Sequence, residues 1–223
     1  EELQFNITEV IGSLFKTHGA RFLPCFVPEW LPRLVDMSQD GCFVSDRKLA
    51  SFVICDLLEH CGEACAPLLD SIMPLLLRGV DSDEPSLRQP AAYGLGVAAS
   101  NAPQSLGTSE WAGHAIQHLC AAAVKPGARA GDQESATDNV VSSIGSFLTS
   151  LAAHPLVQRD MEVLWQQYLA YLPMRGDLEE SGKVLIQLCQ LTRAGDVGLL
   201  GAERQRLAQV WALLAGAVNG PGS

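Results

Sequence analysis

A repeated spacing of about 42 residues is the feature that most constrains how this chain folds. Pro32 lies within one predicted helical segment, and Pro74 lies at the matching place in the next one. Arg47 and Arg88 likewise stand near the starts of two predicted helices, about 41 residues apart. Two landmarks with nearly the same offset indicate that the chain repeats a unit of two helices joined by a turn.

The segment 83–101 shows the pattern of one such helix. An acidic turn comes first, and apolar residues then recur at helical spacing at Leu87, Ala91, Leu95 and Ala98. Gly94 and Gly96 lie among them, although a glycine costs a helix about 1 kcal/mol relative to alanine. We therefore expect a neighbouring helix to approach closely at these glycines. Pro90 predicts a kink or a late start in the same helix.

The other predicted helices follow the same plan. Prolines interrupt the segment 20–37, and Ser45 is expected to cap a helix that Gly62 ends. That helix is expected to bury Leu49, Phe52, Val53 and Leu57. Asp177 and Glu180 form a capping-box pattern at the start of a later helix. Further helices are expected over residues 1–18, 68–79, 108–124, 135–152, 161–172, 178–194 and 203–218.

These elements together predict the fold class. No strands are expected, because no run of β-branched or aromatic residues alternates with polar ones. A helix–turn–helix period of about 40–48 residues is typical of HEAT and armadillo arrays, and an arginine at the second helix favours HEAT repeats. We predict an all-α fold, an α-α superhelix formed by HEAT repeats over residues 1–219, as part of a longer solenoid. Residues 220–223 are expected to be a linker or a cloning remnant.

The net charge of the chain limits the classes of partner that it is expected to bind. The net charge is −10 and the isoelectric point is near 4.9. This acidity argues against direct binding of nucleic acid or of an anionic membrane, and it suits a basic partner. No apolar run reaches the roughly 18 residues that span a bilayer, so no membrane insertion is expected. The first residues also lack the pattern of a signal peptide.

The cysteines and histidines do not form a recognisable reactive site. Seven cysteines stand at scattered spacings, and we expect all of them to be reduced and most to be buried. His60, Cys61 and Cys65 lie close in sequence without a Cys-x-x-Cys pair, so no metal site is predicted. No serine or cysteine nucleophile is matched with a histidine, and we expect neither catalysis nor a cofactor.

Four stretches of the chain resemble consecutive repeats near the carboxyl end of karyopherin-β nuclear import receptors. They are Asp46-Arg-Lys-Leu-Ala with Cys55-Asp-Leu-Leu-Glu-His-Cys61, Leu87-Arg-Gln-Pro-Ala-Ala-Tyr-Gly-Leu-Gly-Val97, Ala136-Thr-Asp-Asn-Val-Val-Ser-Ser-Ile-Gly145 and Tyr171-Leu-Pro-Met-Arg-Gly-Asp-Leu-Glu-Glu180. The resemblance extends from Phe5 to Val218, and the order of the four stretches matches. The branch that the chain resembles most is the importins that carry ribosomal proteins and core histones.

This resemblance implies a function as well as a fold. It implies a superhelix whose second helices line an inner groove, which binds extended basic cargo such as histone tails and ribosomal proteins. It also implies a receptor that shuttles between cytoplasm and nucleus, and whose full length contacts the Ran GTPase and nucleoporins. The chain departs from the family at Pro90, where alanine is usual, and in the Gly- and Ala-rich loop 125–133.

Tyr93, Asn139 and the pair Glu179 and Glu180 fall on three successive second helices. They offer a ring, an amide and two carboxylates, the groups that bind a lysine side chain. The family similarly uses asparagine, acidic and aromatic residues there, and the predicted cargo-binding set is Tyr93, Asn139, Glu179, Glu180, Asp56 and Glu59. Structural roles are open alternatives: Glu179 and Glu180 can stabilise a helix dipole, and Asn139 can bond to the backbone of a neighbouring repeat. Tyr93 can fill the space left by the glycines, and Asp56 and Glu59 are a weaker extension of the set that can lie on a solvated face.

Two functional hypotheses follow. The first is a fragment of a nuclear import receptor, and the second is a HEAT-repeat scaffold or adaptor subunit that binds a folded protein partner. Acidic groups gathered in the groove favour the first, and an exposed apolar patch favours the second. The four tryptophans are expected to anchor packing on the outer layer rather than to bind a ligand; they are Trp30, Trp111, Trp165 and Trp211.

Overall fold

The computed structural model describes residues 2–219 and the side chains of residues 5–217, and every regular element within residues 2–219 is helical. One layer contains the second helix of each pair: α1 (Glu2–His18), α4 (Val44–Cys61), α6 (Pro85–Asn101), α9 (Gln133–Ser150) and α11 (Leu178–Ala194). The other layer contains α2 (Leu23–Glu29), α3 (Leu31–Met37), α5 (Leu69–Asp81), α8 (Trp111–Ala123) and α10 (Pro155–Tyr171). Short helices join them: η1 (Gly19–Phe22), η2 (Gly62–Leu68), α7 (Pro103–Gly107), α12 (Val197–Leu200) and η3 (Ala202–Arg204), before α13 (Leu207–Asn219).

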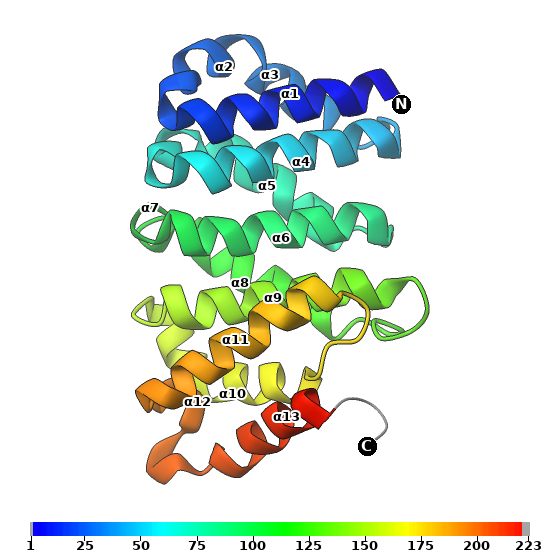
Figure 1. Ribbon diagram of the computed structural model, residues 1–223. Coiled ribbons are helices and arrows are strands. Elements are labelled where there is room, and N and C mark those ends of the chain that lie inside the picture. The colour runs from blue at the N-terminus through cyan, green and yellow to red at the C-terminus, as the bar shows by residue number, and fades with distance from the viewer. Residues whose placement is uncertain (1, 220–223) are drawn as a thin grey trace.

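The helix pairs stack into a solenoid, which confirms the predicted α-α architecture. Figure 1 shows α1, α4, α6 and α9 side by side in the second-helix layer, with α11 crossing more steeply over α9 and the other layer behind. Hydrogen bonds join matching positions of neighbouring repeats. The Trp111 indole N–H donates to Asp70 Oδ1 at 2.8 Å, 41 residues earlier, and Ser135 Oγ donates to the Gly176 carbonyl at 2.8 Å, 41 residues later. The repeat spacing in the sequence is therefore also the contact spacing in the fold.

Several predicted helix starts were wrong. Ser45 does not cap α4, because the helix begins at Val44 after the extended residue Phe43, which makes no side-chain cap. Pro90 does not delay α6, which begins at Pro85 with the Glu84 carboxylate accepting the backbone N–H of Ser86 at 3.2 Å. The helix α10 begins at residue 155, six residues earlier than predicted.

The last helix starts later than predicted. Glu203 has a φ of 53° and Arg204 a φ of 60°, so the backbone at these residues cannot continue a right-handed helix. The helix α13 therefore begins at Leu207 rather than at Glu203. The predicted linker 220–223 lies outside the described residues.

Burial of the predicted side chains is mixed. In α4, Val53 and Leu57 are buried as expected, whereas Phe52 is 42% exposed because it lies on the open side of the second-helix layer. The seven cysteines are free, and only Cys55, Cys61 and Cys65 are buried, so the prediction that most are buried was wrong. Burial raises the pKa of the Cys65 thiol to about 12. Among the tryptophans, Trp165 is buried, but Trp211 is 59% exposed and does not anchor packing as predicted.

The glycines of α6 allow the close helix approach that the sequence predicts. A Cβ atom at Gly94 would lie 3.1 Å from Cys55 Sγ of α4 and 3.0 Å from a Leu76 methyl group of α5. A Cβ atom at Gly96 would lie only 2.6 Å from Ser143 Oγ of α9. Ser143 Oγ donates to the Ala92 carbonyl at 2.6 Å, which fixes α9 against α6. The contact at Ser143 holds α6 against α9 at the centre of the second-helix layer.

Gly96→Ala is expected to lower the free energy of unfolding by about 1–3 kcal/mol, because the added methyl group overlaps Ser143. Gly182 in α11 is the matched control, since no atom lies within 4 Å of a Cβ built there. Gly182→Ala should instead raise stability by up to about 1 kcal/mol through helix propensity. Urea denaturation measures both changes, and equal effects at the two glycines would contradict the close packing of α6 on α9.

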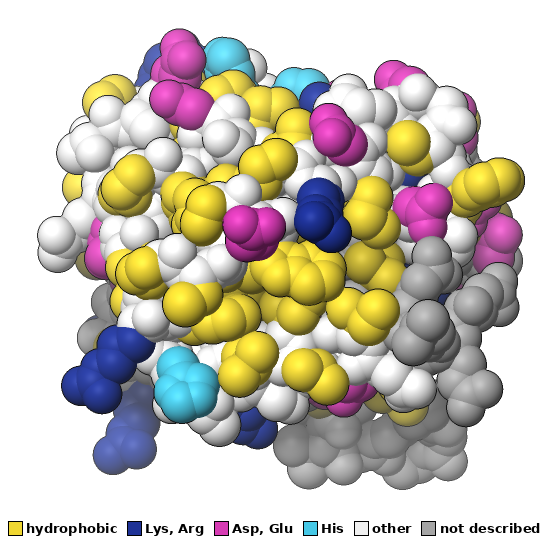
Figure 2. All heavy atoms as spheres, turned by 90° about the horizontal axis from the view of Figure 1, so that it is seen from above, with side chains coloured by type: hydrophobic (Ala, Val, Ile, Leu, Met, Phe, Trp, Pro, Cys, Tyr) yellow, Lys and Arg dark blue, Asp and Glu magenta, His cyan; other side chains and the backbone are white. Residues whose placement is uncertain are grey.

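The end of the solenoid formed by α1, α2 and α3 has an apolar surface. Figure 2 looks onto this end and shows hydrophobic side chains gathered across its middle, with a few charged groups among and around them. The partly buried apolar side chains of η1, α2 and the turn after it are Phe22, Leu23, Val27 and Trp30. None of the helices within residues 2–219 is long and apolar enough to cross a membrane.

Candidate binding groove

Two adjoining hollows lie on the second-helix layer. The first, called here the α11 hollow, has a volume of about 360 Å³ and is lined by side chains of α4, α6, α9 and α11. The second, called the α4 hollow, has a volume of about 570 Å³ and is lined by α1, α4, α6 and α9. Tyr93 and Glu59 line both hollows, so the two form one groove along the layer.

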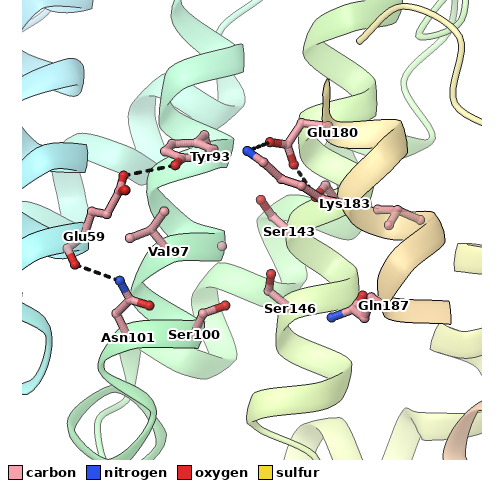
Figure 3. A pocket seen from close by; sticks show the side chains of 13 residues that line it. Glu59, Tyr93, Val97, Ser100, Asn101, Ser143, Ser146, Glu180, Lys183 and Gln187 are labelled. Atoms are coloured by element: carbon pink, nitrogen blue, oxygen red, sulfur yellow. Dashed lines mark hydrogen bonds and ion pairs between the residues drawn. The ribbon is translucent and has the colours of Figure 1, made fainter. Parts of the chain in front are cut away.

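Tyr93 and Glu59 form the partition between the hollows. The Tyr93 hydroxyl donates to Glu59 Oε2 at 3.1 Å, and Asn101 Nδ2 donates to the Glu59 carbonyl at 2.9 Å (Figure 3). Burial of the ring raises the pKa of the Tyr93 hydroxyl, and the neighbouring Glu59 carboxylate raises it further. The hydroxyl therefore stays protonated and donates, and the side chain of Glu59, which accepts this bond, is exposed at the surface of the groove.

An ammonium group of the chain itself lies in the wall of the α11 hollow. Lys183 Nζ lies 2.7 Å from Glu180 Oε1 and 3.1 Å from Glu179 Oε1, and 5.5 Å from the centroid of the Tyr93 ring. Figure 3 shows the Lys183 side chain reaching from α11 toward Tyr93, with its nitrogen at the Glu180 carboxylate. Partial burial lowers the pKa of Lys183, but the hydrogen bonds that its ammonium donates to Glu180 and Glu179 outweigh this effect and raise the pKa. Three of the predicted residues therefore meet around one lysine.

Glu180 is the buried carboxylate of this hollow. It is 6% exposed, and its second oxygen accepts a hydrogen bond from Ser142 Oγ of α9 at 2.6 Å. Asp177 Oδ1 accepts the backbone N–H groups of Glu179 at 3.1 Å and Glu180 at 3.0 Å, so it caps α11 as predicted. The reciprocal half of the capping box is absent, because the Asp177 N–H donates to Asp138 instead. Glu180 is thus turned into the hollow rather than back onto its own helix.

The α4 hollow contains carboxylates without a lysine or arginine partner. Among the described side chains, no lysine or arginine forms a salt bridge with Asp56 or Glu59. Burial raises the pKa of Asp56; His60 opposes this, and the charges of Glu59 and Glu9 add to it. Gly12 makes room for Asp56, since a Cβ there would lie 2.5 Å from Asp56 Oδ2. These carboxylates would therefore attract a cation from outside the chain into this hollow.

Aromatic rings border the α4 hollow. Phe5 is 63% exposed, Phe52 is 42% exposed, and the half-buried Tyr93 forms the opposite side. Lys48 also lines this hollow, and its Nζ lies 5.5 Å from the centroid of the Phe52 ring. Exposed rings next to carboxylates suit the methylene groups and the ammonium of a lysine side chain.

Asn139 has a structural role, but its partner in the neighbouring repeat is the Asp177 side chain rather than the backbone that the sequence alternative named. It is 4% exposed, and its Nδ2 donates to Asp177 Oδ2 at 2.8 Å and to the Ser135 carbonyl at 3.0 Å. Gln89 Nε2 donates to the same Asp177 oxygen at 3.3 Å. The amide nitrogen of Asn139 is therefore committed to holding the start of α11, although the residue also lines the α4 hollow.

Among the groove residues that sequence reasoning missed are Lys183, Ser142, Glu9 and Phe52. Lys183 had a signal, because it stands three residues after Glu180 and four after Glu179, the spacing of helical ion pairs. Nothing in the sequence marks Ser142 or Glu9 as groove residues, since a serine or glutamate on a helix is usually exposed to solvent. Phe52 was assigned to the core rather than to the groove.

Comparison with known proteins finds importins among those that the chain resembles in sequence. The chain is 26% identical to importin-4 of Homo sapiens over 175 residues, which cover 77% of the chain and 15% of that protein. It is 24% identical to a probable importin-5 homolog of Dictyostelium discoideum over 192 residues, which cover 84% of the chain and 17% of that protein. The chain thus spans about one sixth of the length of these relatives. Both are importins, which are transport receptors and not enzymes.

Solved structures show the same fold. The karyopherin Kap121p bound to RanGTP superposes with a TM-score of 0.72 at 20% identity, over 99% of this chain and 21% of that one. Kap121p bound to the SUMO protease Ulp1p gives a TM-score of 0.71 at 21% identity, over 96% of this chain and 21% of that one. No protein-family model matches the chain. The sequence relatives and the shared solenoid together support a HEAT-repeat member of the karyopherin-β family, at low sequence identity.

Proposed function

We propose that this chain is part of a nuclear import receptor and that its groove binds extended, lysine-bearing segments of cargo. The observation that carries the proposal is the α4 hollow, where Asp56 and Glu59 lie beside the rings of Tyr93 and Phe52 without a lysine or arginine partner. Carboxylates supply the countercharge for an ammonium, and the rings contact its methylene groups. Tails of core histones and segments of ribosomal proteins are the class of ligand proposed.

The α11 hollow supports this chemistry from within the chain. Lys183 lies against Glu180, Glu179 and the Tyr93 ring in the arrangement proposed for a cargo lysine. The same ring faces both hollows, so the groove offers related surroundings on the two sides of Tyr93. The net charge of −10 adds long-range attraction for a basic segment.

The wider role rests on the relatives. Kap121p has been solved bound to RanGTP and, separately, to Ulp1p and to Ste12p. We propose by analogy that the receptor containing this chain shuttles between cytoplasm and nucleus, and that Ran and nucleoporins act on it through its full length. Asn139 acts in this scheme by holding the start of α11, next to the glutamates that the groove uses.

Salt titration tests the proposed binding. A fluorescent peptide with several lysines should bind the chain, and its Kd should rise at least roughly tenfold between about 0.05 and 0.5 M salt, because ions screen charge pairs at the protein surface. Fluorescence anisotropy measures the Kd, and a peptide of the same length with glutamine at each lysine is the control. Equal affinity for the two peptides, or a Kd that does not change with salt, would rule out recognition of lysine by charge.

A HEAT-repeat scaffold that binds a folded partner is the second candidate. The apolar end formed by α1, α2 and α3 favours it, because a hydrophobic surface of this kind is usually covered by protein (Figure 2). Binding through this end would be insensitive to salt and to the groove carboxylates. It would instead be lost when Val27, which is partly buried there, is replaced by aspartate.

A further inference from the structure

Lys183 is held in the α11 hollow as a ligand is held in a site. Two carboxylates, Glu180 and Glu179, bind its ammonium at 2.7 and 3.1 Å, and the Tyr93 ring lies beside it. We propose that Lys183 is a built-in competitor: it fills a second lysine site of the groove, and a cargo lysine enters that site by displacing it. This inference rests on the proposed function for its cargo, while the site itself can be tested without any cargo.

The site is built into the fold rather than formed by chance on the surface. Glu180 is more than nine-tenths buried, and the hydroxyl of Ser142 donates to the oxygen that faces α9 at 2.6 Å. A carboxylate buried to this degree needs a cation, because an unpaired charge away from water is costly. Removal of Lys183 therefore leaves a site that still requires an ammonium group.

Lys183 itself is free to leave. Its side chain is 50% exposed, and that of Glu179 is 81% exposed, so the open side of the hollow faces solvent. Lysine has a flexible four-carbon stem, and its ammonium can move into water by side-chain rotation alone.

The two hollows then differ in the free energy that a cargo lysine needs in order to enter. A lysine entering the α4 hollow meets Asp56 and Glu59 directly, whereas one entering the α11 hollow must first replace Lys183. Because both hollows share Tyr93 and Glu59, one extended segment passes from one to the other. Lys183 thereby raises the number of basic residues that a segment needs in order to bind well, which makes it a determinant of specificity.

Chemical rescue tests the site directly. In Lys183→Ala, added butylammonium chloride is expected to raise Tm by at least about 3 °C more than the same concentration of sodium chloride does, because a ligand of the native state stabilises it. Wild type should show no such difference, since Lys183 occupies the site. The double variant Lys183→Ala with Glu180→Gln should also show none. An equal response of all three proteins to butylammonium would overturn the inference.

Peptide affinity tests the competition. Lys183→Ala should bind a peptide with two or more lysines at least about threefold more tightly than Arg193→Ala, which removes an exposed positive charge near the end of the same helix. Lys183→Gln serves for the comparison if Lys183→Ala does not fold. Equal affinity of the Lys183 and Arg193 variants would contradict competition, because both lose one charge.

The two proposals fail in different ways. If no lysine peptide binds but butylammonium rescues Lys183→Ala, the proposed function is wrong and the ammonium site is real. If the peptide binds and depends on Glu59, but rescue and the affinity gain are both absent, the competitor role of Lys183 is wrong and the proposed function survives.

Discussion

Replacing Asp138 with alanine is expected to lower the free energy of unfolding by about 3 kcal/mol. Asp138 is fully buried in α9, and its Oδ2 accepts the backbone N–H groups of Arg175 at 3.1 Å, Gly176 at 2.7 Å and Asp177 at 2.9 Å. These three donors form the turn that starts α11. Each hydrogen bond to a charged group contributes about 1.5–3 kcal/mol. The expected loss is smaller than the sum of three such bonds, because water can reach part of this turn when the carboxylate is gone.

Asp138→Asn is the matched control for this prediction. The amide keeps one acceptor oxygen at nearly the same place, so the loss of stability should be clearly smaller than for alanine. Urea denaturation with circular dichroism measures both variants. A loss below about 1 kcal/mol for Asp138→Ala would mean that the turn before α11 does not depend on this carboxylate.

Glu59→Lys is expected to weaken binding of a lysine peptide at least about tenfold, which corresponds to about 1.4 kcal/mol. Glu59 lines both hollows, and its reversal removes an attraction and adds a repulsion in each. The Glu59 side chain is exposed, so the fold should tolerate the change, with the 3.1 Å hydrogen bond from Tyr93 lost. Circular dichroism checks the fold, and fluorescence anisotropy measures the Kd.

Glu29→Lys is the control for charge alone. Glu29 is exposed at the end of α2 and lines neither hollow, but its reversal changes the net charge by the same amount. Its effect on the Kd should stay within about threefold, because an exposed charge far from the groove is screened. Comparable losses for the two reversals would show that binding follows overall charge rather than the groove.

The sequence suggested Glu179 and Glu180 as the acidic pair that binds cargo. Charge reversal at Glu180 does not test cargo binding alone, however, because it also changes the packing of the protein. Glu180 is buried and held by Ser142 and Lys183, so a lysine there would place a second cation beside Lys183 at a buried position. Such a variant would disturb α11 whether or not cargo binds there. Burial, which the sequence does not show, decides which carboxylate is useful.

Much of the fold could be predicted because it follows from local signals. The bounds of α11 were predicted correctly, since Asp177 caps its start and Gly195 ends it with a left-handed φ of 70°. The failure at Ser45 has a physical cause: serine is a good cap only if the chain is extended there, and here the extended residue is Phe43. Glu203 and Arg204 failed for the opposite reason, because nothing in their type predicts a positive φ.

The sequence predicted which helices line the groove, but not which of their side chains face it. The sequence placed Tyr93, Asn139 and Glu180 on consecutive second helices, but it did not fix the rotation of each helix about its axis. On α9 the α11 hollow is lined by Ser142, one turn after Asn139, which instead supports the start of α11. The position of Lys183 depends on how α11 crosses toward α6, which only tertiary packing determines.

The most direct measurement of lysine recognition by the groove is a double-mutant cycle between Glu59 and a peptide lysine. The Kd of a lysine peptide and of its Nε-acetylated form is measured with wild type and with Glu59→Gln, since acetylation removes the lysine charge. If Glu59 binds that lysine, acetylation should weaken binding at least about tenfold to wild type and less than about threefold to Glu59→Gln. Acetylation that weakens binding equally to both proteins would contradict the placement of cargo lysine in this groove.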